Sequence, residues 1–185
     1  MSGEDPTPAT PPTNSTPPDA GSAPGLDPAD LATLEQQLGR PARGVVGVAA
    51  RCICGRPTVV RTAPRLADGT PFPTTFYLTH PRAVAAASTL EASGLMREMT
   101  ARLAQDDVLA DAYRRAHEHY RAQRRELGEP PEIEGISAGG MPTRVKCLHV
   151  LIAHSLAAGP GVNPLGDEAL ALVRGQWSPD VCTCP

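Results

Sequence analysis

Hydrophobic residues recur at helical spacing near the start of the folded part of the chain. In residues 28–38 (PADLATLEQQL) three leucines lie at i, i+3 and i+7, on one side of a helix. Asp27 precedes a proline that suits the first helical position, and Gly39 follows the last leucine. The pattern predicts a first helix over residues 28–38 with one buried side.

Short valine-rich runs follow this helix. Residues 44–51 and 58–62 are separated by CICGRP, which is typical of two strands joined by a tight connection. After an Asp-Gly turn signal, residues 74–79 (TTFYLT) give a third run. We expect three consecutive strands that form a small antiparallel sheet.

The composition becomes helical from residue 81 onward. An alanine-rich stretch over 82–93 is stopped by Gly94, and helices over 95–103, 108–127 and 167–174 are expected as well. One face of the long helix carries Leu109, Tyr113, His117, Tyr120 and Arg124. We predict a single α+β domain over residues 29–185, in which a three-stranded antiparallel sheet packs on four to six helices.

The most apolar stretch lies between two glycine- and proline-containing segments. A proline at position 142 suits a first helical turn and Gly159-Pro160 ends the run, so the sequence predicts a central helix from Pro142 to Ala158. The glycines Gly139 and Gly140 come directly before it.

Two cations lie at the predicted start of this helix. Arg144 and Lys146, the only lysine in the chain, would face the positive end of the helix dipole, which is unfavourable unless an anion is bound there. The backbone of Gly139 and Gly140 would let a ligand approach closely. This predicts a phosphate-containing ligand, a small molecule or polyphosphate, with His149 as a nearby donor or general acid.

Other interpretations of these cations and of the following loop stay open. Glu132 or Glu134 could fold back to pair with the cations. Asn163 and Asp167 could contact the ligand or cap structure, with Asn163 starting a turn and Asp167 starting the last helix.

Cys147, His149 and His154 are the candidates for catalysis. On a continuous helix Cys147 and His149 point apart, and Cys147 and His154 are about 10 Å apart along the axis. A nucleophile–base pair would therefore need a partner from another segment, for which the chain offers His80, His117 and His119.

Five cysteines in a chain without an export signal favour reduced thiols or a metal site over disulfides. Thiolates at Cys52, Cys147, Cys182 and Cys184 could bind zinc or an iron–sulfur cluster if the C-terminal segment folds back. The C-x-C spacing, which includes Cys54, is not the usual C-x₂-C of a zinc knuckle.

Residues 1–28 contain eight of the 21 prolines and one leucine, so we expect a disordered tail.

The rest of the chain has 17 basic and 16 acidic residues. A nearly neutral domain does not favour nucleic-acid binding. No apolar run reaches the roughly 18 residues of a membrane span. We expect a cytoplasmic protein.

Four strings of residues carry a family resemblance: 69–81 (GTPFPTTFYLTHP), 94–100 (GLMREMT), 112–120 (AYRRAHEHY) and 140–172 (GMPTRVKCLHVLIAHSLAAGPGVNPLGDEALAL). The chain resembles the actinobacterial "domain of unknown function 501" family. That resemblance implies genes near an exopolyphosphatase and a septum-formation-initiator protein, and assigns no chemistry.

The sequence therefore leaves three functions open. The first is binding of a phosphate-containing ligand at the predicted central helix. The second is a non-enzymatic adaptor in a cell-envelope or division assembly, which would bind a protein partner through the tail or through the arginine-rich helix over residues 108–127. The third is a thiolate metalloprotein.

Overall fold

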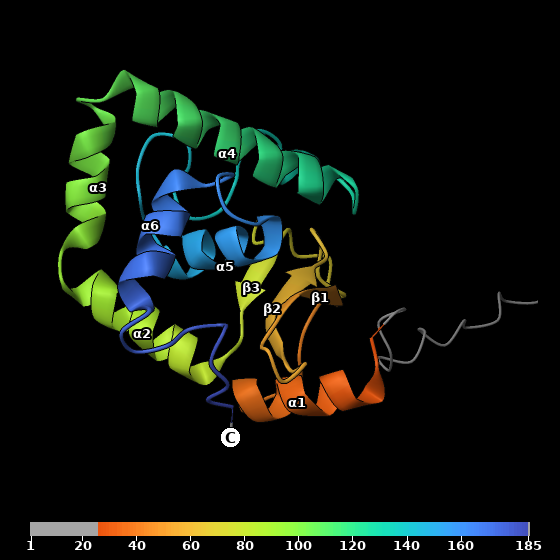
Figure 1. Ribbon diagram of the computed structural model, residues 1–185. Coiled ribbons are helices and arrows are strands. Elements are labelled where there is room, and N and C mark those ends of the chain that lie inside the picture. The colour runs from red at the N-terminus through yellow and green to blue at the C-terminus, as the bar shows by residue number, and fades with distance from the viewer. Residues whose placement is uncertain (1–25, 185) are drawn as a thin grey trace, which may run out of the picture.

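The computed structural model describes residues 26–184, and the predicted tail lies outside these residues except for its last three. The described part contains a three-stranded antiparallel sheet in the order β1-β2-β3 and six α-helices (Figure 1). This confirms the predicted α+β architecture. No helix in the described part is both long enough and apolar enough to cross a membrane.

The strands follow the predicted valine-rich runs. Strand β1 spans Val45–Arg51, β2 spans Pro57–Thr62, and β3 is shorter than predicted, at Phe76–Leu78. Val48 pairs with Val60, which in turn pairs with Tyr77. The segment before β3 leaves the ladder, although Thr62 N still donates to the carbonyl of Thr75 at 2.9 Å.

The helices lie close to their predicted positions, with two exceptions described below. Their bounds are α1 Pro28–Leu38, α2 Pro81–Ala92, α3 Leu95–Leu103, α4 Asp107–Arg125, α5 Leu148–Ala158 and α6 Pro164–Val173. A short 3₁₀ turn, Pro131–Ile133, follows α4.

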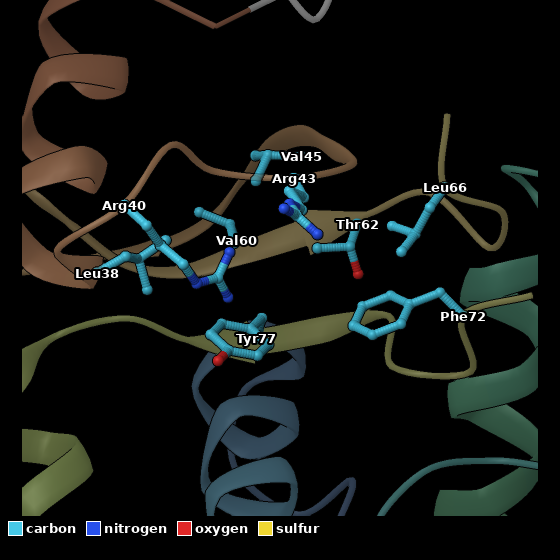
Figure 2. Close-up of a pocket in the computed structure, with 9 residues that line it drawn as sticks. All are labelled: Leu38, Arg40, Arg43, Val45, Val60, Thr62, Leu66, Phe72 and Tyr77. Atoms are coloured by element: carbon cyan, nitrogen blue, oxygen red, sulfur yellow. The ribbon is translucent and has the colours of Figure 1, made fainter. Parts of the chain in front are cut away.

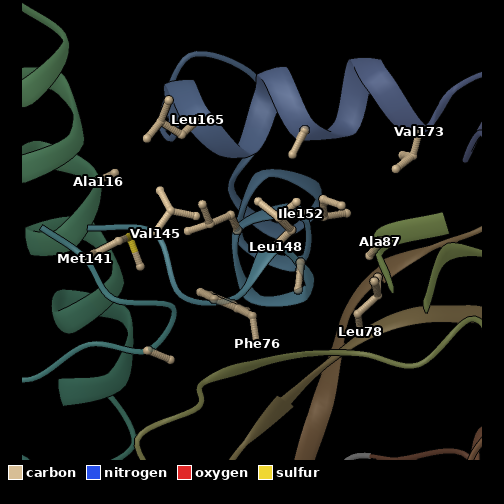
Figure 3. Close-up of a cluster of buried hydrophobic side chains, with 14 of the residues drawn as sticks. Phe76, Leu78, Ala87, Ala116, Met141, Val145, Leu148, Ile152, Leu165 and Val173 are labelled. Atoms are coloured by element: carbon tan, nitrogen blue, oxygen red, sulfur yellow. The ribbon is translucent and has the colours of Figure 1, made fainter. Parts of the chain in front are cut away.

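Helix α5 is the centre of the main hydrophobic core. Side chains from β3, α2, α4 and α6 point toward it from several sides, among them Phe76, Ala87 and Leu165 (Figure 3). Because Leu148, Leu151 and Ile152 are all fully buried, α5 has apolar neighbours around most of its circumference. It is therefore a buried core helix and not an amphipathic surface helix.

Helix α6 approaches α5 very closely. A Cβ atom added at Gly166 would lie 2.4 Å from the carbonyl oxygen of Leu151 and 2.4 Å from the Ser155 hydroxyl, so only glycine fits there. Asn163 caps α6, since its side chain accepts a hydrogen bond from Gly166 N at 3.0 Å. The prediction that Asp167 starts this helix is wrong, because Asp167 lies in its first turn.

The second face of the sheet is only partly covered. Helix α1 packs on it through Leu34, which joins Val45 and Val60 in a small second core. The α1 helix lies at one end of the sheet and leaves part of that face open (Figure 1).

Helix α4 supports the sheet from the far end. The Tyr120 hydroxyl accepts a hydrogen bond from Thr75 N at 2.7 Å, and the fully buried Arg124 donates to the Ile133 carbonyl at 2.8 Å. His117, predicted as part of the apolar face, is buried with Nδ1 2.9 Å from the Ser137 hydroxyl. This helix therefore holds the loops on either side of it through polar contacts inside the core.

Candidate functional sites

Four cysteines come together where the β1–β2 turn meets the C-terminal segment. The sulfur atoms of Cys52, Cys54, Cys182 and Cys184 all lie within 4.8 Å of one another, and those of Cys54 and Cys184 are 3.4 Å apart. All four are free thiols. Of the four cysteines named as metal candidates from the sequence, Cys52, Cys182 and Cys184 lie in this group together with Cys54, whereas Cys147 lies elsewhere.

Backbone hydrogen bonds shape this cluster. Gly55 N donates to the carbonyl of Cys52 at 2.8 Å, and Gly55 has a φ of 87°, which a side chain would disfavour. Ile53 N donates to the Pro179 carbonyl at 3.3 Å and so attaches the C-terminal segment to the turn. The turn directs two thiols toward the two that come from the end of the chain.

The four thiols are not equivalent in acidity. The Arg56 backbone N–H and the neighbouring Cys184 thiol lower the pKa of Cys54 to about 7, whereas burial raises the pKa values of Cys52 and Cys184. Nε2 of the buried His80 lies 3.4 Å from the Cys184 sulfur. Cys54 is thus readily ionised at neutral pH, and an imidazole lies beside Cys184.

A second group of reactive side chains lies at the start of α5. The prediction that this helix begins at Pro142 is wrong: it begins at Leu148, and Cys147 is extended, with φ −154° and ψ 113°. Because Cys147 precedes the helix, its sulfur lies 3.8 Å from His149 Nδ1. The expectation that these two side chains point apart therefore fails together with the helix boundary.

Glu91, from the last turn of α2, completes this group. Its Oε1 accepts a hydrogen bond from Leu148 N at 2.7 Å and lies 3.0 Å from His149 Nδ1. The Cys147 thiol and the Glu91 carboxylate raise the pKa of His149 to about 9, although burial opposes them. The acceptor at the start of α5 is thus a carboxylate of the protein itself, and it is neither Glu132 nor Glu134.

The residues predicted to bind phosphate lie upstream of α5. The glycines Gly139 and Gly140 have φ values of 76° and 92°, and their carbonyls accept hydrogen bonds from Lys146 N at 2.7 Å and Arg144 N at 3.2 Å. Within residues 26–184 neither cationic side chain has a hydrogen bond or an ion pair. Glu132 pairs with Arg65 at 2.7 Å instead.

His154 lies inside the core and is fully buried. Asn163 uses its side-chain oxygen to cap α6, so its amide NH₂ faces His154 Nδ1 at 3.2 Å. Nδ1 therefore accepts, and Nε2 donates to His119 Nδ1 at 2.9 Å. Burial, followed by the nearby His119, lowers the pKa of His154 to about 3. This geometry favours a structural role for both His154 and Asn163.

Asp167 also has a partner within the chain. One of its carboxylate oxygens accepts a hydrogen bond from Gly161 N at 2.7 Å, across the loop between α5 and α6. Asp167 also lines a pocket of about 330 Å³ together with Ser155 and Arg174.

A pocket of about 320 Å³ that the sequence did not reveal lies on the open face of the sheet. Its floor is apolar, and the guanidinium groups of Arg40 and Arg43 extend into the same space as the rings of Tyr77 and Phe72 (Figure 2). Within the described part of the chain neither arginine has a carboxylate partner at ion-pair distance. Only the topology brings the segment after α1 next to β3, so no local pattern could have identified this pocket.

Comparison with known proteins places this chain in a family. A family model described as "Protein of unknown function (DUF501)" matches residues 48–171. The chain belongs to the DUF501 family. The DUF501 match includes Cys52, Cys54, Glu91, Cys147 and His149, whereas Cys182 and Cys184 lie beyond its end. No curated protein and no solved structure matches the chain.

Proposed function

We propose that this DUF501 protein is a zinc protein in which Cys52, Cys54, Cys182 and Cys184 bind one Zn²⁺. The observation that carries the proposal is the placement of all four sulfur atoms within 4.8 Å of one another. Two come from one turn and two from a segment about 130 residues further along the chain. Four cysteine thiolates that converge in this way are a common set of ligands in structural zinc sites.

The spacing of the sulfurs suits a single tetrahedral metal ion. With Zn–S bonds of about 2.3 Å, a tetrahedron places its sulfurs about 3.8 Å apart. The observed 3.4 Å between Cys54 and Cys184 is close to this value. A cluster of several irons spreads its thiolates over more than one metal and needs them further apart. Since four protein ligands leave no open position, this zinc would be structural.

The zinc would attach the C-terminal segment to the hairpin. Trp177, on this segment, is buried and packs on His80 with ring centroids 5.3 Å apart. A cross-link that closes a loop of this length restricts the unfolded chain by about 5 kcal/mol. Because thiols this close would oxidise outside a reducing compartment, the proposal also supports a cytoplasmic location.

The test is the metal content and stability of the untagged protein. We expect bound zinc in the purified wild type, and a lower melting temperature after chelation that added Zn²⁺ restores. The variant Cys184→Ser should lose this zinc, whereas Thr183→Ser, in the same segment, should keep it. Identical zinc contents in the two variants would contradict the proposal, as would a disulfide between Cys54 and Cys184 in protein kept under reducing conditions.

A second candidate function is the binding of a phosphate-containing ligand. The observation that favours it is the pocket on the open face of the sheet, where Arg40 and Arg43 extend beside Tyr77 and Phe72 (Figure 2). Two guanidinium groups bind phosphate or carboxylate well, and the apolar floor would take an uncharged body such as a nucleobase. At the start of α5, by contrast, Glu91 already accepts from the first free backbone N–H.

A thermal-shift screen with phosphate, pyrophosphate, short polyphosphate and nucleotides tests this pocket. Stabilisation that is lost in Arg43→Gln but kept in Lys146→Gln would support binding on the sheet, and the reverse would support the site before α5. Absence of a shift with every anion would remove this candidate.

The adaptor function has support at one place on the surface. Ile53 and Val181 are exposed large apolar residues: Ile53 lies between Cys52 and Cys54, and Val181 directly precedes Cys182. The backbone hydrogen bond from Ile53 N to Pro179 joins the two segments. A partner that binds here would be lost on Ile53→Ser while zinc is kept, which pull-down with each variant would show.

A further inference from the structure

The side chains at the start of α5 have the arrangement of a second, open metal site. The possible donor atoms are the Cys147 sulfur, His149 Nδ1 and a carboxylate oxygen of Glu91, and all lie within 4.8 Å of one another. His149 Nδ1 is 3.0 Å from Glu91 Oε1 and 3.8 Å from the Cys147 sulfur. A thiolate, an imidazole and a carboxylate at such distances match the ligands and spacing of tetrahedral zinc.

The far side of the His149 ring supports the same conclusion independently. Nε2 lies 3.1 Å from the carbonyl oxygen of Val84 and 3.2 Å from the hydroxyl of Ser88, both on α2. A carbonyl can only accept, so Nε2 carries the hydrogen. A metal ion that displaces the Nδ1 proton would therefore meet the lone pair of Nδ1, which faces Cys147 and Glu91. A histidine that binds a metal usually donates its other ring N–H to a carbonyl or carboxylate in this way.

The local backbone explains why these three side chains meet. Cys147 is extended and His149 lies in the first helical turn, so their side chains are on the same side although they are two residues apart. Glu91 is held in place by Leu148 N, which donates to it at 2.7 Å. The contact between α2 and α5 thus supplies all three groups from well-packed elements.

One side of the group faces open space. Cys147 and His149 line a pocket of about 340 Å³, together with apolar side chains that include Phe76, Leu78 and Val84. A metal with three protein ligands keeps one position for water or another ligand, which distinguishes catalytic zinc sites from closed four-cysteine sites. The pocket would place a small, mainly apolar molecule beside that position.

From these observations we infer that Glu91, Cys147 and His149 form a zinc site with an open coordination position that faces the pocket between α2, α5 and β3. The site is separate from the four-cysteine centre and does not depend on it. Zinc bound here would lower the pKa of its water, as is needed for hydrolytic chemistry on a small apolar substrate.

The test is zinc stoichiometry in the full-length protein. We expect two zinc ions per chain in the wild type, and one each in the Cys182→Ser/Cys184→Ser and Cys147→Ala variants. The stoichiometry separates the two proposals: failure of the four-cysteine centre leaves the zinc that depends on Cys147, and failure of the open site leaves the zinc that depends on Cys184. A Cys147→Ala protein with the same zinc content as the wild type would overturn the inference.

Glu91→Gln is the matched variant that guards against misfolding. Its amide oxygen can still accept from Leu148 N, so α5 keeps its first hydrogen bond while the metal loses an anionic ligand. We expect the Kd of the second zinc to rise by about 100-fold, since loss of an outer partner alone costs about 10–100-fold. An unchanged Kd in a folded Glu91→Gln protein would also refute the site.

Cobalt substitution gives a readout of the open position. Azide added to the Co²⁺ protein should change the visible absorption of the wild type and of Cys182→Ser/Cys184→Ser, because an open site can accept it. It should leave Cys147→Ala unchanged, since a closed four-cysteine site has no free position. An azide response that persists in Cys147→Ala would place the open metal elsewhere.

Discussion

Acidification should destabilise the protein through His154 at a pH well above the range in which carboxylates titrate, because this histidine takes up a proton when the chain unfolds. The ring is fully buried, and its Nδ1 already accepts a hydrogen bond from Asn163. Its pKa is about 3 in the folded state, against an ordinary value of 6.5. Between pH 3 and pH 6.5 His154 is protonated in the unfolded chain but stays neutral in the folded protein, so the free energy of unfolding falls as the pH drops below 6.5.

The size of the effect follows from that difference in pKa. pH 5 lies about 1.5 units below the ordinary pKa of histidine, so proton binding stabilises the unfolded state by about 2 kcal/mol at that pH. Burial also lowers the pKa values of His80 and His117, which act in the same direction. The contribution of His154 therefore has to be isolated with a variant.

Urea denaturation at pH 7, 6 and 5 measures this contribution. His154→Gln has no titrating ring but keeps an N–H donor for His119. We expect it to be less stable than the wild type at pH 7 and to lose about 2 kcal/mol less between pH 7 and pH 5. Tyr120→Phe is the control, because it loses a buried hydrogen bond to Thr75 without changing a titration in this range. Equal pH dependence of His154→Gln and the wild type would refute the reasoning.

Three further substitutions test a close packing contact, an ion pair and the hydrogen bonds of a buried arginine. Gly166→Ala would force a methyl group against the backbone of α5 and should cost about 3 kcal/mol in thermal or urea unfolding, whereas Gly175→Ala meets open space and should not. Asp30→Asn removes the partner of Arg51, at 2.7 Å, and should cost about 1 kcal/mol at pH 7. Because Arg51 lowers the pKa of Asp30, that difference should vanish as the pH falls through the lowered pKa. Arg124→Lys cannot reach both the Ile133 and Pro73 carbonyls and should cost about 2 kcal/mol; an unchanged urea midpoint would show that the guanidinium is not needed.

Local patterns predicted most of the elements correctly. The leucine spacing and its flanking residues placed α1 at Pro28–Leu38 and the glycine at 94 placed α3 at Leu95–Leu103, as observed. The error at Pro142 has a local cause: Gly139 and Gly140 have positive φ and Arg144 N donates back to the Gly140 carbonyl, so this proline lies in a turn. A proline at a first helical turn looks the same in sequence.

The candidate sites depend on contacts that no local pattern contains. The C-terminal cysteines do fold back toward the hairpin, but they meet Cys54 and not Cys147, because the sequence does not show which cysteines the topology brings near the hairpin. Glu91 was missed altogether, since a glutamate in the last turn of an alanine-rich helix looks like a solvent-exposed residue. Its role depends on the packing of α2 against α5, which is a tertiary contact.

The burial of α5 should make the two proposed metal sites differ in their dynamics. Amides of a helix enclosed on most sides exchange with solvent mainly through global unfolding, whereas a segment at the edge of a fold opens locally. Cys147 and His149 adjoin α5, so the backbone that positions these two side chains should open only about as often as the whole domain unfolds, even though the pocket lets a zinc ion exchange without such opening. The four-cysteine centre joins a hairpin turn to the C-terminal segment, and zinc could leave it while the core stays folded. Hydrogen exchange in the presence of a chelator would therefore show early loss of protection around Ile53 and Val181, and late loss along Leu148–Ala158.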